Sequence, residues 1–291
     1  MGENGNHPGV KAVEVRRRTP GSKPILILAG LFVIATFLAW YFTWFGRELS
    51  DADISKYLAD EKNPRHVQHA LLQVQQRIER GDATSKNWYP QLIQLSSSAE
   101  PEFRLTVAWL MGFDNQSPQF HESLLKLLKD QEPIVRRNAA LALVRFNDPS
   151  GREELVSILK PYSVKAPVNG VVASSLKEGA TVARNTLVAR IDQPDKTVVE
   201  IRSPLLGKIE KVGKANGTQV SQGDEVLSLN SDENSVWEAL RGLSFIGTAE
   251  DIPVVEGYAK SSDVSTRIHD QANLTLKAIQ SRTHTENTKA H

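Results

Sequence analysis

The segment Val164–Ile191, VKAPVNGVVASSLKEGATVARNTLVARI, decides the fold of the middle of the chain, because a second copy follows it. That copy is Ile201–Leu229, IRSPLLGKIEKVGKANGTQVSQGDEVLSL. Gly179 of the first copy has its match in Gly217 of the second, 38 residues further on. In both copies, short runs of alternating residues are broken by glycine turns, which predicts β-strands. Two such halves can cross over and bury a shared apolar face.

The two copies also share a motif. The first reads Ala-Pro-x-x-Gly-x-Val and then Glu-Gly-x-x-Val, and the second reads Ser-Pro-x-x-Gly and then Gly-Thr-x-Val-x-x-Gly-Asp. Over residues 163–230 this pattern resembles the biotinyl/lipoyl domain family. The same barrel-sandwich hybrid occurs in the membrane-fusion, or periplasmic adaptor, proteins of bacterial export pumps. The resemblance implies an all-β barrel-sandwich domain at 163–230.

Lys196 is the candidate cofactor-binding residue that this resemblance implies. In lipoyl domains the attachment lysine follows an aspartate at the tip of the hairpin between the halves, and Asp195-Lys196-Thr197 fills that place. Against a lipoyl- or biotin-type carrier, the loop after Ile191 is one residue longer than in carriers and contains Pro194, and the biotin pattern Met-Lys-Met is absent. The topology predicted below also separates Lys196 from cytoplasmic ligases. We therefore expect no cofactor, with a lipoyl or biotin group on Lys196 as the alternative.

Residues 49–160 show helical spacing of apolar residues. The motif Pro-x-x-Arg occurs at Pro101 and again at Pro133, 32 residues on. A period of roughly 30–40 residues read as helix pairs is typical of an α-solenoid. Asp130–Leu159, DQEPIVRRNAALALVRFNDPSGREELVSIL, resembles a HEAT repeat of the short bacterial type. The resemblance implies stacked helix pairs and protein partners.

Helical patterns return after the middle domain, in residues 232–282. We expect these C-terminal HEAT-like helices to pack back on 49–160, so that the β domain is an insertion; two separate helical pieces are the alternative. A short solenoid needs every neighbour to bury its core, which favours the packed-back arrangement. The polar end, residues 283–291, is predicted to be disordered.

The N-terminal region predicts a membrane anchor. Residues 25–45, ILILAGLFVIATFLAWYFTWF, are 21 uncharged residues. A helix of that length, at 1.5 Å per residue, spans a hydrocarbon core of about 30 Å. The bulky residues at its end disfavour a cleaved signal peptide. Basic residues precede the run and acidic residues follow it, so we expect a disordered cytoplasmic tail at 1–23, a transmembrane helix at 24–46 and an extracytoplasmic (periplasmic) remainder, in the inner or plasma membrane.

Several classes of function find no support in the sequence. The net charge is +1 and no basic run is interleaved with aromatic residues, so no nucleic-acid partner is expected. Cysteine is absent, which removes thiol chemistry. His66 and His69 have helical i,i+3 spacing but lack a third ligand, so no metal site is expected. Arg136 and Arg137 are expected to pair with acidic groups of the next repeat. Catalytic motifs such as G-x-S-x-G and H-E-x-x-H do not occur, and no enzyme is predicted.

The sequence thus predicts a multidomain α plus β protein: an N-terminal transmembrane helix and a HEAT-like α-solenoid with an inserted barrel-sandwich domain. Its expected function is that of a non-enzymatic, membrane-anchored scaffold or adaptor of the bacterial envelope, mediating protein–protein interaction in an export or other membrane assembly. The alternatives are a carrier modified at Lys196 and a small-ligand sensor.

Overall fold

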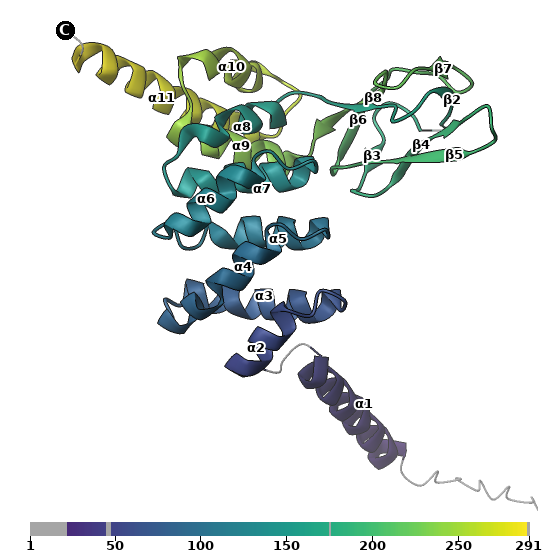
Figure 1. The fold of residues 1–291 in the computed structure, drawn as a ribbon, viewed down its shortest axis with the longest axis vertical. Helices are drawn as coiled ribbons and strands as arrows, with labels where there is room; N and C mark the ends of the chain where they lie inside the picture. Colours follow the sequence, from purple (N-terminus) through teal and green to yellow (C-terminus); the bar gives the residue numbers. More distant parts are fainter. Residues whose placement is uncertain (1–21, 45–47, 175, 290–291) are drawn as a thin grey trace, which may run out of the picture. The chain divides into compact units, whose positions relative to one another are not determined.

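The structure is a computed structural model that describes residues 22–44, 48–174 and 176–289. The chain divides into two compact units, Met1–Glu48 and Leu49–His291. The first contributes α1 (Ser22–Trp44), and the second holds the helical repeats and the β domain (Figure 1).

The predicted membrane span is corrected by the structure. In the described part of the chain, no helix combines the length and the apolar character that a membrane crossing requires. An uncharged run predicts a span only where the helix that it forms meets both requirements. The single-pass location with residues 25–45 in the bilayer, an inside N-terminus and a periplasmic remainder is therefore contradicted. The predicted tail, residues 1–23, lies outside the described residues except for the first two residues of α1.

Short helices follow one another through the first part of the second unit. Several begin with proline at their first turn, where the missing N–H would have no helical partner in any case. The helices are α2 (Asp51–Leu58), α3 (Pro64–Glu79), α4 (Tyr89–Leu95), α5 (Pro101–Met111), α6 (Pro118–Leu127), α7 (Pro133–Arg145) and α8 (Arg152–Ile158), with 3₁₀ turns at Ala83–Trp88 and Pro149–Gly151.

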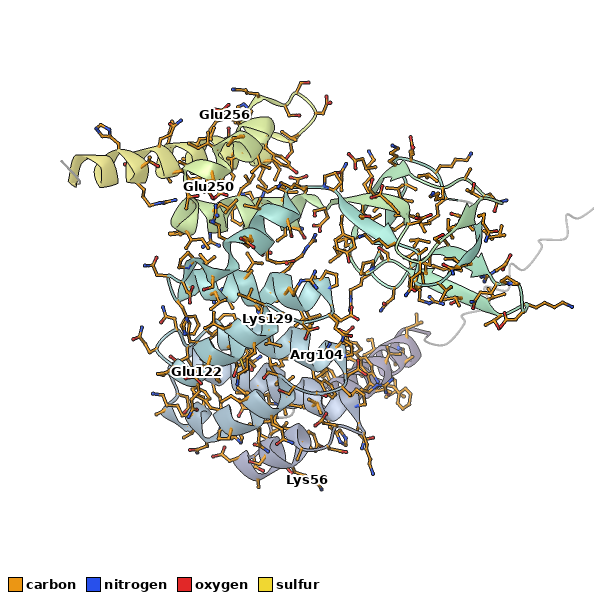
Figure 2. All side chains as sticks on the ribbon, turned by 45° about the horizontal axis from the view of Figure 1, so that its top comes forward. Lys56, Arg104, Glu122, Lys129, Glu250 and Glu256 are labelled. Carbon is orange, nitrogen blue, oxygen red and sulfur yellow. The ribbon has the colours of Figure 1, made fainter. Side chains whose placement is uncertain are left out.

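The two Pro-x-x-Arg motifs make equivalent contacts. Arg104 donates to the carbonyls of Ser98 and Ala99, and Arg136 donates to those of Asp130 and Gln131. Each arginine therefore holds the loop that precedes its own helix. Each also reaches forward to an acidic residue. Arg104 pairs with Asp130 at the start of the next repeat, and Arg136 pairs with Glu154 within its own repeat. Figure 2 labels Arg104 on the helical stack.

The forward ion pairs lie between neighbouring helices. Arg104 forms a two-point pair with Asp130, at 2.7 Å from Nε and 2.9 Å from the second guanidinium nitrogen. Arg136 Nε lies 3.1 Å from a carboxylate oxygen of Glu154. Although burial alone would raise the pKa of Asp130, hydrogen bonds from Arg104 and a backbone N–H hold it below its usual range. Asp130 is therefore ionised and paired at neutral pH.

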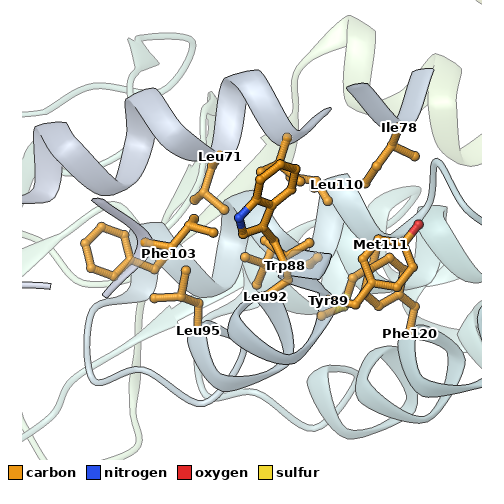
Figure 3. Close-up of a cluster of buried hydrophobic side chains, with 14 of the residues drawn as sticks. Leu71, Ile78, Trp88, Tyr89, Leu92, Leu95, Phe103, Leu110, Met111 and Phe120 are labelled. Atoms are coloured by element: carbon orange, nitrogen blue, oxygen red, sulfur yellow. The ribbon is translucent and has the colours of Figure 1, made fainter. Parts of the chain in front are cut away.

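Aromatic and aliphatic side chains of α2–α7 form one continuous core. Trp88 is its largest fully buried side chain and lies among Leu71, Leu92 and Leu110 (Figure 3). The indole N–H of Trp88 donates to the hydroxyl of Ser55 at 2.9 Å, so the buried ring leaves no polar group unpaired. Burying a large apolar side chain contributes roughly 1.5–3 kcal/mol, which makes this core the main source of stability for the stack.

The β domain consists of two four-stranded antiparallel sheets. One has the order β1-β8-β6-β3 and the other β5-β4-β2-β7. Each sheet therefore contains strands from both sequence copies, and their inner faces share one apolar core. The strands are β1 (Tyr162–Lys165), β2 (Gly170–Ala173), β3 (Thr181–Val182), β4 (Leu187–Asp192), β5 (Val198–Arg202), β6 (Gly207–Val212), β7 (Gln219–Val220) and β8 (Glu225–Ser231).

The internal duplication appears as a pseudo-twofold in the hydrogen bonds. The N–H of Gly179 donates to the carbonyl of Ile209 at 2.8 Å. The N–H of its match, Gly217, donates to the carbonyl of Val172 at 2.7 Å. Both glycines have positive φ, +84° and +82°, a conformation that favours glycine. The glycine spacing in the sequence thus marks the same turn twice, once in each half.

The helices after the β domain pack against those before it. They are α9 (Glu233–Ile246), α10 (Ile252–Lys260) and α11 (Thr266–Lys289), with a 3₁₀ turn at Ala249–Asp251. Their apolar residues share a core with α8 and with Ala140 of α7. Arg152 of α8 donates to Asp251 at 2.8 Å and to Glu250 at 2.9 Å. Residues 283–289, expected to be disordered, continue α11, because they extend a helix whose preceding turns are anchored in this core.

The β domain leaves and rejoins the helices at neighbouring points. Its first strand pairs with its last, with Tyr162 opposite Leu229, so the chain enters after α8 and returns beside its entry point before α9. An insertion whose ends are adjacent does not disturb the packing of the element that receives it. The helical stack can therefore close through α8 and α9 around the inserted domain.

Candidate functional site

Lys196 lies at the tip of the β4–β5 hairpin, on the exposed surface. The N–H of Lys196 donates to the carbonyl of Gln193 at 3.0 Å, and the N–H of Gln193 donates to the carbonyl of Thr197 at 2.9 Å. This is a three-residue hairpin loop, Pro194 to Lys196, whose last residue has the left-handed φ that such loops need. Lys196 has a φ of +68°.

The loop accommodates both sequence features that set it apart from the carriers. Pro194 occupies the second position of the turn, where its fixed φ is favourable. The carboxylate of Asp195 accepts the N–H of Thr197 at 2.9 Å, and this backbone hydrogen bond, with a second one from the Thr197 side chain, lowers the pKa of Asp195. The tip is therefore an ordered turn that presents the lysine side chain to solvent. Its modification stays a proposal.

The two histidines singled out in the sequence have different partners. His66 stacks on Tyr57 with ring centroids 4.2 Å apart, and its Nδ1 lies 2.8 Å from a carboxylate oxygen of Asp60. This hydrogen bond lowers the pKa of Asp60. His69 instead contacts the side chain of Gln73 at 3.0 Å. Across the described residues, His, Asp and Glu form no group of three that could hold a metal ion.

The two consecutive arginines of α7 also differ. Arg136 pairs with Glu154 of α8, which belongs to the same repeat and not to the next one as predicted. Arg137 is only 3% exposed, and its Nε has no hydrogen-bond partner among the described residues. Burial lowers the pKa of Arg137, while the nearby charge of Glu154 acts in the opposite direction. Arg137 therefore forms no direct ion pair with the described residues, and the prediction of one is wrong for this arginine.

A groove of about 340 Å³ lies between α5, α7 and α9, and no motif in the sequence points to it. Its lining is mostly apolar and includes two aromatic residues and a glycine. The lining residues are Trp109, Leu141, Val144, Arg145, Glu238, Arg241, Gly242 and Phe245. Phe245 is 57% exposed, an unusual position for a large apolar side chain.

Arginine stacking on aromatic rings continues along this surface. The guanidinium of Arg145 lies 5.3 Å from the ring centroid of Trp109 and 4.6 Å from that of Phe113. On α9, Arg241 lies 5.6 Å from the ring centroid of Trp237. Stacking on a ring fixes the orientation of a long side chain and leaves its N–H groups available. The arginines of the groove are thus held in position by aromatic neighbours.

Glu238 is the acidic residue of the groove. Burial raises its pKa, and the negative charge of Asp232 adds to this effect. Arg241 and Arg145 act in the opposite direction but do not reverse the shift. Burial also lowers the pKa of Arg145, and the like charge of Arg241 lowers it further. The groove therefore holds charged groups in surroundings that disfavour charge.

Gly242 lies where α9 packs closely against α8. A Cβ at Gly242 would lie 2.7 Å from a methyl group of Leu155 and 3.3 Å from one of Val144. The absence of a side chain allows α9 to approach α7 and α8 closely. The groove is therefore a consequence of close helix packing, which brings residues from both sides of the β insertion onto one surface.

Comparison with known families identifies two modules. Residues 89–177 match the family model of HEAT repeats, and residues 162–229 match a biotin/lipoyl family model described as biotin-requiring enzyme. The chain therefore carries a HEAT-repeat region followed by a biotinyl/lipoyl-type domain. This confirms the resemblance read from the sequence. No curated protein matches the chain.

Two solved structures show limited similarity. One is titled as a single-chain, multi-domain long-chain acyl-CoA carboxylase, at 18% identity and a TM-score of 0.24, with 34% of this chain covered. The chain spans 10% of that carboxylase. The other is an engineered protein, at 15% identity and a TM-score of 0.42, with 78% of each chain covered.

The fold class is therefore a mixed one, a helical repeat region with an all-β domain. HEAT repeats are modules of protein interaction, and the β domain is of the type that carries biotin or lipoyl groups. Together they indicate an interaction scaffold or a carrier.

Proposed function

We propose that this chain is a non-enzymatic scaffold that binds a partner protein on its helical repeats. The observation that carries the proposal is the groove between α5, α7 and α9, which is lined by Phe245, Trp109 and two arginines stacked on aromatic rings. Aromatic residues and arginine dominate the binding energy of protein interfaces. A groove with these residues, partly apolar and open to solvent, has the composition of a docking site.

The experiment compares Phe245→Ala with a matched control. Phe245 and Leu274 are large apolar side chains with nearly equal exposure, 57% and 58%, but Leu274 lies on α11, outside the groove. The full chain and the two variants are tagged and purified from their native cells, and co-purifying proteins are quantified. We expect Phe245→Ala to reduce recovery of a specific partner about tenfold, because truncating a hot-spot anchor costs about 1.4 kcal/mol or more and each ~1.4 kcal/mol is tenfold in affinity. Leu274→Ala should leave recovery unchanged.

Two outcomes would contradict the scaffold function. The first is that no protein co-purifies specifically with the wild-type chain. The second is that recovery falls equally in Phe245→Ala and Leu274→Ala, because the groove then has no special part in binding. Circular dichroism of both variants should show unchanged helix content, since exposed side chains contribute little to stability.

A carrier modified at Lys196 is the second candidate. Its supporting observation is the exposed lysine at an ordered hairpin tip in a domain that matches the biotin/lipoyl model. Intact mass and peptide mapping of the native protein across Lys196 test this candidate. A lipoyl or biotinyl adduct would support the carrier, whereas the scaffold proposal expects an unmodified lysine.

A further inference from the structure

Two guanidinium groups line the groove without a carboxylate partner. Among the described residues, neither Arg145 nor Arg241 takes part in an ion pair. Arg145 makes a single long hydrogen bond, 3.5 Å, to the carbonyl of Gly112. By contrast, Arg77, Arg104, Arg136 and Arg152 of the same helical stack each pair with an acidic residue.

The two arginines also lie close enough for their like charges to interact. Arg241 acts on Arg145 as a repelling charge, and both line one groove with a single acidic residue, Glu238. An anion placed between them would relieve this repulsion and gain charge-assisted hydrogen bonds from both. Because the arginines are fixed by stacking, little side-chain entropy would be lost on binding.

We propose that this groove binds a short acidic segment of a partner protein, in which an Asp or Glu lies beside a large apolar residue. The carboxylate lies between Arg145 and Arg241, and the apolar side chain occupies the space between Trp109 and Phe245. This inference rests on the proposed scaffold function and specifies the chemistry of its partner. The apolar lining favours a peptide over a free anion or a nucleic-acid backbone, neither of which would fill it.

Glu238 limits the affinity of the groove for an acidic segment. As a carboxylate in the same groove it opposes the binding of a second acid, and no ion pair with Arg145 or Arg241 within the described residues neutralises it. The other charged groups that act on it are Asp232 on the loop before α9, Arg145 of α7, Arg241 of α9 and Arg267 of α11. Replacing Glu238 by Gln keeps the shape of the groove and removes one negative charge. Glu238→Gln should therefore strengthen binding of an acidic segment several-fold.

The experiment selects peptides with the full chain as bait. A display library of random twelve-residue peptides is panned against the wild-type chain, the charge-reversal variant Arg145→Glu/Arg241→Glu, and the control Arg190→Glu/Arg202→Glu, which reverses two exposed arginines of the β domain. We expect wild type and control to enrich peptides with Asp or Glu beside Phe, Leu or Trp. The groove variant should lose these peptides and enrich Lys or Arg in their place.

Binding of one enriched peptide is then measured by fluorescence anisotropy. We expect at least a tenfold loss with the groove variant, several-fold tighter binding with Glu238→Gln, and a loss of affinity as salt rises, because the carboxylate contact is electrostatic. Enriched peptides without acidic residues, or a selection unchanged by the groove variant, would overturn the inference, as would a library that yields no enriched peptide. If partner recovery still depends on Phe245 in that case, the scaffold function stands and only the acidic chemistry fails.

Discussion

At the scale of single residues, Lys196 combines an exposed side chain with a backbone conformation that favours glycine. Its φ of +68° costs a residue with a Cβ roughly 1–2 kcal/mol relative to glycine. We therefore expect Lys196→Gly to stabilise the hairpin by about 1 kcal/mol and Lys196→Arg to leave it unchanged. Hydrogen exchange of the β4 and β5 amides measures the effect.

The control is Lys208, an exposed lysine of β6 outside the left-handed region. Lys208→Gly should reduce protection, because glycine inside a strand destabilises it by roughly 0.5–1 kcal/mol. Equal changes at the two positions would contradict the turn geometry described for the tip.

Arg104 is the residue whose loss should destabilise the helical stack most directly. Its partner Asp130 has a side chain only 7% exposed, so Arg104→Ala leaves a buried carboxylate unpaired. We expect a loss of about 3 kcal/mol in the free energy of unfolding at neutral pH, measured by urea denaturation. Arg65→Ala, an exposed change on α3, should stay within about 0.5 kcal/mol.

The pH dependence of this effect has a defined sign. The pKa of Asp130 is lowered in the folded protein from its ordinary value of 3.8, so the unfolded chain binds the proton more tightly. The ion pair therefore contributes fully above that value, and its contribution is lost as the pH falls below it. The difference between Arg104→Ala and wild type should shrink in acid. A difference that grows below pH 4 would contradict the pairing.

Sequence reasoning at this scale succeeds where a residue's role is set by its neighbours in the chain. The repeat pattern predicts an acidic partner for Arg136, but that partner, Glu154, lies in the same repeat and not in the next one. Arg137 shows the limit, because its burial and its unpaired Nε depend on tertiary packing. Likewise, the sequence places Lys196 at a hairpin tip, but its left-handed φ is visible only in the structure.

At the scale of elements, two glycines of the helical region should respond oppositely to alanine. A Cβ at Gly151 would lie 2.7 Å from the Cα of Ala140, a backbone atom of α7 that cannot move aside cheaply. Gly151→Ala should therefore destabilise the stack by roughly 1–3 kcal/mol. Gly257, inside α10, has nothing within 4 Å of its Cβ position, so Gly257→Ala should stabilise by roughly 0.5–1 kcal/mol. Thermal unfolding of both variants tests the pair, and a loss in both would contradict the assigned packing.

The duplicated β domain is the element that sequence predicts best. Glycine spacing repeated in two halves implies two equivalent turns, and Gly179 and Gly217 make matching hydrogen bonds. The arrangement of the helical region is harder to predict from the sequence, because its short helices have similar apolar patterns. For α1, the absence of charge in the sequence was an insufficient criterion for a membrane span.

At the scale of the whole molecule, the groove could not have been found from the sequence. Trp109, Arg145 and Phe245 lie on three helices, and the entire β domain separates the first two residues from the third. In the sequence, nothing distinguishes any of these three residues from other positions of its helix. Only the packing of α9 against α7 and α8 gathers them, which is why a repeat pattern predicted a protein-binding fold but not its binding surface.

The central claim is that partners dock on the helical repeats rather than on the lysine hairpin. The most direct measurement is hydrogen–deuterium exchange of the full chain, with and without a co-purified partner. We expect the partner to slow exchange at the ends of α5, α7 and α9 that carry Trp109, Arg145 and Phe245. Exchange of residues 193–197 should not change when the partner binds. Slower exchange confined to the β4–β5 hairpin would contradict the scaffold account and favour the carrier.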